Sequence, residues 1–337
     1  MTTSLISLSE PTATDLPSHP ATDPCAWLTD DDAARIAAAL AATCAASTRK
    51  VYAFAWGRWM RWCSGRGIMS FPAEPAAVCA YLTECAEQRL SLATIDSACS
   101  AIAHQHRSHG VSDPIAHDAV RQVRRGLRRI IGRAPRRPAR PLSVAELRQI
   151  VAAIDRATDR GVRDTALLLL GFAGALRRTE LAALTLADLE AKPGGLLLHL
   201  RRSKTDQEAR GQVVGIAHGQ HPLTDPIAAL DAWLALRGTA PGPVFTSLRP
   251  GGPPLRPLSG NAVSTLVKER ALAAGLSGGR ISGHSLRAGH ATSAALAGVG
   301  VDRIAAQTRH RRIDILIDRY IRPVQALQTT SGRDLGL

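Results

Sequence analysis

Five short segments in the second half of the chain carry side chains that could act on a phosphate ester. Arginine and lysine bind anions, histidine moves protons, and tyrosine offers a nucleophilic oxygen. Two of these residues, His284 and Arg287, stand at i and i+3 and on a helix would point to one side. In chain order the segments are Gly-Ala-Leu-Arg-Arg-Thr-Glu-Leu (174–181), Ser-Lys-Thr-Asp (203–206), Gly-His-Ser-Leu-Arg (283–287), Thr-Arg-His (308–310) and Asp-Arg-Tyr-Ile-Arg (318–322).

The chain as a whole is strongly basic, with a net charge of +14 and a pI of about 10.6. A surplus of this size implies a polyanionic partner, either nucleic acid or an anionic membrane surface. Nearly all of the positive charge is arginine, whose planar fork suits bidentate phosphate contacts. Part of this arginine usage reflects what a GC-rich genome encodes, but base composition does not explain the excess over acidic residues.

The five segments, in this order and at these separations, resemble the tyrosine recombinase (phage integrase) family. The likeness spans about residues 28 to 330, and the domain plan looks most like that of Cre-like and Xer-like site-specific recombinases. It implies an enzyme that cuts and rejoins DNA through a 3′-phosphotyrosine intermediate, without ATP, metal or cofactor. By the same resemblance the catalytic residues are Arg177, Lys204, His284, Arg287, His310 and Tyr320, with Glu180 supporting the first arginine.

The chemistry of phosphodiester cleavage agrees with these roles. Charge builds on the non-bridging oxygens under attack, and the guanidiniums of Arg177 and Arg287 could clamp them without a metal. A phenol with a pKa of about 10 is only roughly 0.1% ionised at pH 7, so Tyr320 needs nearby cations or a base. His284 is the candidate base, and Lys204 on the 203–206 turn could protonate the leaving 5′ oxygen.

His310 is expected to hydrogen-bond a non-bridging oxygen or to support the tyrosine. The family usually places the late His/Trp nine positions before the tyrosine, whereas 310 and 320 are ten apart. The segment after His310 therefore holds one additional residue, and Arg311 is an alternative occupant of the position. Tyr320 has no such competitor, because the other tyrosines, Tyr52 and Tyr81, lie in the first half of the chain.

The elements that position these residues fall into a mainly α fold with a small β-hairpin or sheet. Residues 1–27 are expected to form a disordered arm and residues 28–132 a helical domain. The resemblance implies that this helical domain is a SAM-like core-binding domain for DNA. Asp30 and Ser47 are expected to cap its first two helices. Tryptophans at three- and four-residue spacing in the second helix indicate core packing.

An Arg/Pro linker is expected at residues 133–141, after a helix at 114–131 whose surface is rich in arginine. From residue 121 to residue 140 there are nine arginines and no acid, which indicates contact with the DNA backbone. The DNA-binding candidates are Arg121, Arg124, Arg125, Arg128, Arg129, Arg133, Arg136, Arg137 and Arg140.

Residues 142–337 are expected to form an α+β catalytic domain. Ser143 and Glu146 make a capping box, and two strands are expected at 196–201 and 212–216. Helices are expected near 162–172, 177–185, 224–237, 259–274, 284–298, 301–307 and 313–321. By resemblance the tail after Tyr320 docks on a neighbouring protomer. The implied assembly is a homotetramer on two DNA sites, one dimer per inverted-repeat site of double-stranded DNA.

Other features narrow the class of protein. The six cysteines form no C-x-x-C pair and suit reduced thiols, and neither a zinc-ligand spacing nor a P-loop occurs. Without a signal peptide or a long apolar run, the protein is expected to be cytoplasmic and free of membranes. Two alternatives remain open: a type IB-like DNA topoisomerase, which shares this chemistry, and a non-catalytic DNA-binding regulator.

Overall fold

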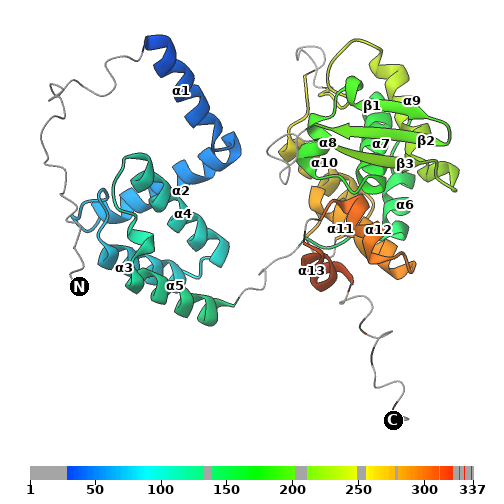
Figure 1. Cartoon of the computed structure of the whole chain (residues 1–337). Helices are drawn as coiled ribbons and strands as arrows, with labels where there is room; N and C mark the ends of the chain where they lie inside the picture. Colours follow the sequence, from blue (N-terminus) through cyan, green and yellow to red (C-terminus); the bar gives the residue numbers. More distant parts are fainter. Residues whose placement is uncertain are drawn as a thin grey trace, which may run out of the picture. The chain divides into compact units, whose positions relative to one another are not determined.

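The structure is a computed structural model that describes residues 29–132, 139–201, 211–248, 256–277, 280–310 and 312–321, with positions 326, 330 and 335. The chain divides into two compact units, residues 1–136 and 137–337. Helices dominate both units (Figure 1), as the sequence predicted. Within the described residues, no helix combines the length and the apolar character that crossing a bilayer requires. The expected arm at 1–27 and most of the linker lie outside the described residues.

The first unit is a helical bundle with its own hydrophobic core. Trp59 is fully buried in that core, and its indole nitrogen donates to the Ser70 carbonyl at 2.9 Å. Trp62 packs beside it and donates to Glu84 at 2.9 Å, so the core placement of the tryptophans is confirmed. The helices are α1 (Asp30–Ala42), α2 (Ala46–Ser64), α3 (Pro75–Glu87), α4 (Leu92–Ser108), the short 3-10 helix η1 (Pro114–Ala116) and α5 (Asp118–Ile131).

The two helix caps predicted for this unit are wrong by one or two positions. Thr29, directly before α1, accepts a hydrogen bond from the Asp32 amide at 3.1 Å, so Asp30 already belongs to the helix. α2 begins at Ala46 behind Ala45, which has no capping oxygen, and Ser47 lies inside the first turn. A favourable cap residue indicates roughly where a helix starts, but tertiary packing decides the residue at which it begins.

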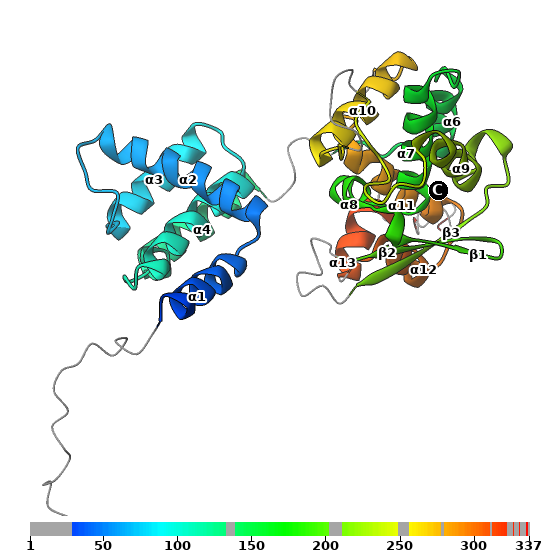
Figure 2. The same ribbon diagram turned by 90° about the horizontal axis from the view of Figure 1, so that it is seen from above.

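The second unit has a three-stranded antiparallel sheet on one face (Figures 1 and 2). β1 (Leu189–Lys192), β2 (Gly195–Leu200) and β3 (Gln212–Ala217) pair in the order β1-β2-β3. Alternate residues of β2 and β3 are buried against the helical core. β2 and β3 were predicted, whereas β1 was missed because a segment of four residues is too short to show a clear period.

Helix α7 is the centre of this unit and is buried along most of its length. Its leucines pack against the inner face of the sheet and against the surrounding helices. The capping box of Ser143 and Glu146 at the start of α6 is present as predicted. The remaining elements are α6 (Val144–Ala152), α7 (Asp159–Ala173), α8 (Arg178–Ala183), η2 (Leu186–Asp188), η3 (Pro222–Thr224), α9 (Pro226–Arg237), α10 (Gly260–Ala273), α11 (Gly283–Leu296), α12 (Val301–Thr308), α13 (Ile313–Leu316) and the π-helical turn η4 (Ile317–Ile321).

The first turns of α11 are fixed by the chain segment that precedes α6. The Leu142 amide donates to the Ser285 carbonyl at 3.1 Å, and the Arg140 amide donates to the Arg280 carbonyl at 2.9 Å. A Cβ atom at Gly289 would lie 2.0 Å from the Leu142 carbonyl oxygen, so only glycine permits this approach. The helix that carries two of the predicted site residues therefore has a defined position.

A buried carboxylate, Asp164, ties α7 to α10. Arg163 donates to one of its oxygens at 2.9 and 2.6 Å, and Arg270 reaches the other at 2.8 and 2.7 Å. Arg163 also donates to the Thr246 carbonyl at 3.0 Å. Because Asp164 has no exposed surface, removing its charge would leave two guanidiniums without their counter-ion.

We therefore expect Asp164→Asn to reduce the free energy of unfolding by about 3–5 kcal/mol. Asp231→Asn, on the exposed face of α9, is the matched control and should stay within about 0.5 kcal/mol of the parent protein. Urea unfolding followed by circular dichroism measures both. A loss for Asp164→Asn no greater than that of the control would contradict the network's role.

Candidate active site

His284 and Arg287 are presented by the N-terminal turn of α11. The Ser282 side chain caps this helix by accepting from the His284 amide. The apolar face of α11 packs into the core, which directs the i and i+3 polar residues together toward a neighbouring loop. The imidazole Nε2 of His284 lies 2.9 Å from the Tyr320 hydroxyl oxygen. The structure thus joins two of the predicted residues that are 36 positions apart.

Tyr320 sits in the π-helical turn η4 that follows α13. Its ring is 8% exposed and packs in a cluster with Ala288, Ile304 and Leu316. A π turn closes its hydrogen bonds one residue later than an α turn, so it holds one residue more. This turn can absorb the additional residue noticed between His310 and Tyr320.

Arg177 stands at the start of α8 and is held by Glu180. Its backbone amide donates to Glu180 Oε2 at 2.8 Å, and its Nη1 donates to Oε1 at 2.5 Å. Burial raises the pKa of Glu180, but the charges of Arg309 and Arg177 outweigh burial and keep that pKa below its usual value. Glu180 is therefore a buried anion that is hydrogen-bonded to both the backbone and the side chain of Arg177.

Arg287 reaches from α11 to the same loop. Its Nη1 donates to the Ala175 carbonyl at 2.8 Å, and its Nη2 donates to the Thr308 carbonyl. Burial and the charges of Arg177 and Arg309 lower the pKa of Arg287 to about 9. Three guanidiniums thus gather around a single carboxylate. Such an excess of buried positive charge favours the arrival of an anion, which relieves the repulsion.

His310 lies beside the tyrosine. Its ring centroid is 5.8 Å from that of Tyr320, and its Nδ1 lies 2.7 Å from the Thr308 hydroxyl oxygen. Burial and the charges of Arg287 and Arg177 lower its pKa to about 4, so the ring is neutral at physiological pH. His310 was predicted to fill the late His/Trp position, and the structure places it next to Tyr320. The alternative, Arg311, lies outside the described residues.

The protonation states of Tyr320 and His284 follow from their surroundings. Burial raises the pKa of Tyr320 despite the charges of Arg287, Arg319 and Arg177. His284 is open to solvent on one side; desolvation of the other side and the charges of Arg287 and Arg319 lower its pKa. At neutral pH the pair therefore consists of a protonated phenol and a neutral imidazole, which can accept the phenolic proton.

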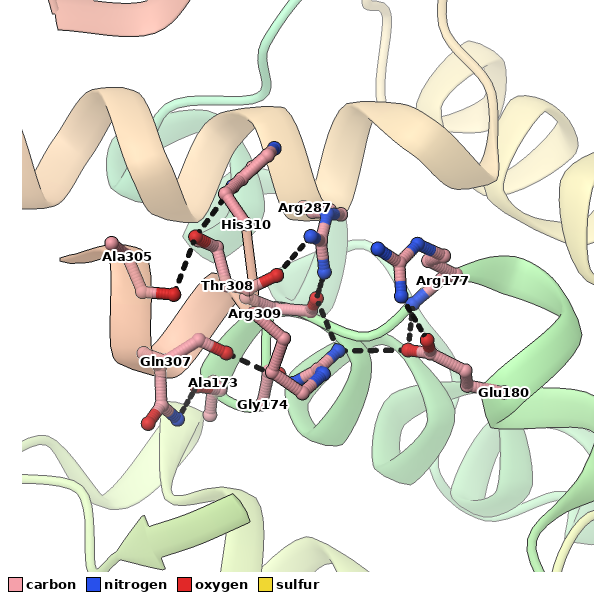
Figure 3. Close-up of polar contacts among 11 residues, drawn as sticks. Ala173, Gly174, Arg177, Glu180, Arg287, Ala305, Gln307, Thr308, Arg309 and His310 are labelled. Atoms are coloured by element: carbon pink, nitrogen blue, oxygen red, sulfur yellow. Dashed lines mark hydrogen bonds and ion pairs between the residues drawn. The ribbon is translucent and has the colours of Figure 1, made fainter. Parts of the chain in front are cut away.

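No role was predicted from the sequence for Arg309, although it belongs to the Thr-Arg-His segment. Arg309 is 7% exposed and donates to Glu180 Oε2 at 2.7 Å. It also donates to the carbonyls of Gly174 at 3.1 Å and Ala175 at 3.2 Å. Figure 3 shows it beneath Arg287 and directed at Glu180. The only signal in the sequence was an arginine next to a predicted site histidine.

The remaining predicted residues are only partly described. Lys204, Arg133, Arg136, Arg137 and most of the tail after Tyr320 lie outside the described residues.

On α5, Arg124 and Arg128 turn toward Asp96 of α4 at 2.9 and 3.2 Å, whereas Arg125 and Arg129 are exposed. The other two DNA-binding candidates that the structure describes also form salt bridges within their own unit. Arg121 pairs with Asp118, and Arg140 pairs with Glu146.

Comparison with known proteins adds independent evidence. Residues 140–326 match the model of the phage integrase family. Over 279 residues the chain is 32% identical to an integrase/recombinase XerD homolog of Selenomonas ruminantium, an alignment that covers 82% of this chain and 81% of the relative. It is 28% identical over 285 residues to the recombinase Cre of Escherichia phage P1, covering 78% and 80% of the two chains.

Solved structures agree on the fold. XerH recombinase bound to a palindromic difH substrate superposes with a TM-score of 0.61 at 13% identity, over 83% of this chain and 78% of that chain. A lambda integrase dimer bound to a core site gives 0.59 at 19% identity, over 86% and 75%. These confirm the expected mainly α fold with an α+β catalytic domain. The family model spans more than half of the chain, and the identity to the XerD homolog extends over both units. The chain therefore belongs to the phage integrase family and is a tyrosine-type site-specific recombinase.

Proposed function

We propose that Tyr320 attacks a DNA phosphodiester held between Arg177 and Arg287, forming a 3′-phosphotyrosine and releasing a 5′ hydroxyl. The observation that carries this proposal is the 2.9 Å separation of the Tyr320 oxygen from His284 Nε2, beside two guanidiniums close enough to influence the phenol's pKa. Fixed cations at this position stabilise the charge that develops on the non-bridging oxygens.

The same groups account for the proton transfers of the reaction. His284 Nε2 takes the phenolic proton as the Tyr320 oxygen bonds to phosphorus. The bond from phosphorus to the 5′ oxygen breaks, and Lys204, by resemblance, protonates that oxygen. His310, neutral beside the tyrosine, hydrogen-bonds a non-bridging oxygen. In the reverse direction a 5′ hydroxyl attacks the phosphotyrosine, so the phosphodiester energy is retained and rejoining needs no ATP.

The DNA partner is double-stranded, with inverted-repeat sites, and we propose that four chains join two such sites. The net charge of +14 supports a DNA partner. A solved XerH complex holds a palindromic substrate, and a solved lambda integrase complex is a tetramer on a Holliday junction. In this proposal residues 28–132 and 142–337 act as two DNA-gripping domains joined by the Arg/Pro linker. We propose that the reaction takes place in the cytoplasm.

The first test concerns the nucleophile. A target duplex is selected from randomised DNA by binding to the protein, and denaturation-resistant adducts are then measured on labelled DNA. Tyr320→Phe should bind this duplex with a dissociation constant close to that of the parent protein and form no adduct, because the attacking oxygen is gone. Tyr81→Phe, in the first unit, is the control and should retain adduct formation. An adduct surviving denaturation in Tyr320→Phe would contradict the assignment.

The second test uses pH. Because the pKa of His284 is lowered from its ordinary 6.5, the base stays neutral down to a more acidic pH than usual. The second-order rate constant for adduct formation should therefore be constant above pH 6.5 and fall as pH drops through that lowered pKa, by about tenfold per pH unit. Any further loss from His310 would begin only near pH 4.

His284→Asn should be slow at every pH and should lack this acidic limb. An acidic limb centred above pH 6.5, or one that persists unchanged in His284→Asn, would remove His284 from the role of base.

The third test concerns the exposed arginines of α5. Replacing Arg125 and Arg129 with glutamine should weaken binding similarly on all sequences and reduce the slope of log K against log salt by roughly 1.8, or about 0.9 for each lost phosphate contact. Arg124→Gln is the matched control on the same helix, because its guanidinium is engaged with Asp96. Equal slopes in the double variant and the parent protein would place these arginines away from the DNA.

A further inference from the structure

Arg309 stands where three parts of the site meet. Its guanidinium donates hydrogen bonds to the loop that leads to Arg177, to the carboxylate of Glu180 and to the C-terminal end of α12 (Figure 3). Its side chain is 4% exposed, so it is unavailable to DNA from solvent. A guanidinium that is buried here and cannot reach the substrate must act through its neighbours.

The backbone of Arg309 adopts a conformation that is unfavourable for a residue other than glycine, which indicates that its side chain has a role. Arg309 has a φ of +55° and ends α12 in the left-handed conformation, where glycine is the usual residue. A non-glycine residue in this region is strained, because its Cβ atom comes close to the following carbonyl oxygen. Arginine at this position forms hydrogen bonds that glycine could not make.

Those hydrogen bonds fix both catalytic arginines at once. The Ala175 carbonyl accepts from Arg309 Nη2 at 3.2 Å and from Arg287 Nη1 at 2.8 Å. Glu180 Oε2 accepts from Arg309 at 2.7 Å while Oε1 accepts from Arg177 at 2.5 Å. Arg309 therefore shares one acceptor with each of the two arginines that would hold the phosphate.

The electrostatic consequence concerns the charge of Glu180. With Arg309 in place, this carboxylate is divided between two cations. Without Arg309, Arg177 would be the remaining cation hydrogen-bonded to it among the described residues, and Glu180 would draw that guanidinium away from an incoming phosphate. We propose that Arg309 is a positioning residue that keeps Arg177 and Arg287 poised for the phosphate. This inference rests on the proposed function.

Three substitutions separate charge, hydrogen bonding and backbone strain. Arg309→Gly removes the guanidinium and relaxes the backbone, Arg309→Met removes the charge at similar length, and Arg309→Lys keeps the charge without the planar fork. The readouts are the dissociation constant for the selected target duplex, the single-turnover rate of adduct formation and the melting temperature. A nick in the duplex beside the mapped cleavage position lets the cleaved end dissociate, which traps the adduct.

We expect the dissociation constants to stay within about threefold of the parent value, because Arg309 is buried. The adduct rate should fall by roughly 10- to 100-fold in the Gly and Met variants, the range typical of residues that orient catalytic groups. Arg309→Lys should recover part of this loss. Wild-type adduct rates in the Gly and Met variants, or losses in all three that merely follow the folded fraction, would overturn the proposal.

A double-mutant cycle tests the route through Glu180. If Arg309 acts by way of this carboxylate, Arg309→Met combined with Glu180→Gln should be little slower than the slower single variant. Fully multiplicative losses would mean that the two residues act independently and would overturn the proposal. Adduct formation by the parent protein distinguishes the proposed function from the role of Arg309. If the parent protein forms no adduct, the proposed function is contradicted. If the parent protein forms the adduct and the Arg309 variants form it at the same rate, only the role of Arg309 is contradicted.

Discussion

The organisation of the active site depends on one buried carboxylate, that of Glu180, which lies among three guanidiniums. Glu180 receives hydrogen bonds from Arg177 and Arg309, while Arg287 lies near enough for its own pKa to be lowered by both guanidiniums. A protein interior tolerates such crowding only when hydrogen bonds hold each group in place. Here backbone carbonyls supply those bonds, and the charge that remains uncompensated is what a phosphate would neutralise.

The rest of the second unit keeps this arrangement rigid. α7 is buried along most of its length and leads into the loop carrying Arg177, and the Asp164 network fixes α7 to α10. Segment 140–142 is hydrogen-bonded to Ser285 at the start of α11 and packs against Gly289 further along the helix, which leaves His284 and Arg287 little freedom. The tyrosine comes from a different kind of element, a short π turn that follows α13. Fixed cations and a nucleophile on a separate, shorter element suit a reaction in which the phosphate must be gripped before it is attacked.

Much of the site could be predicted from the sequence because its motifs are local. The i, i+3 spacing of His284 and Arg287 and the three residues from Arg177 to Glu180 each belong to one helix start, and helix geometry determines their direction. The long α7 and the strands β2 and β3 follow from their apolar composition. The place of Arg309 could not be predicted, because its partners are some 130 positions away and its left-handed backbone leaves no mark on a neighbouring residue. The strand β1 and the π turn are too short to show a period, and the pairing of Arg124 with Asp96 depends on the packing of α5 against α4.

The most direct test of this account is the chemical identity of the attachment point. DNA–protein adducts formed on the selected duplex can be digested with nuclease and trypsin and examined by mass spectrometry. The account predicts that the residual nucleotide mass lies on Tyr320, linked through a 3′ phosphate. Attachment to Tyr52, Tyr81 or any serine, or linkage through a 5′ phosphate, would contradict it.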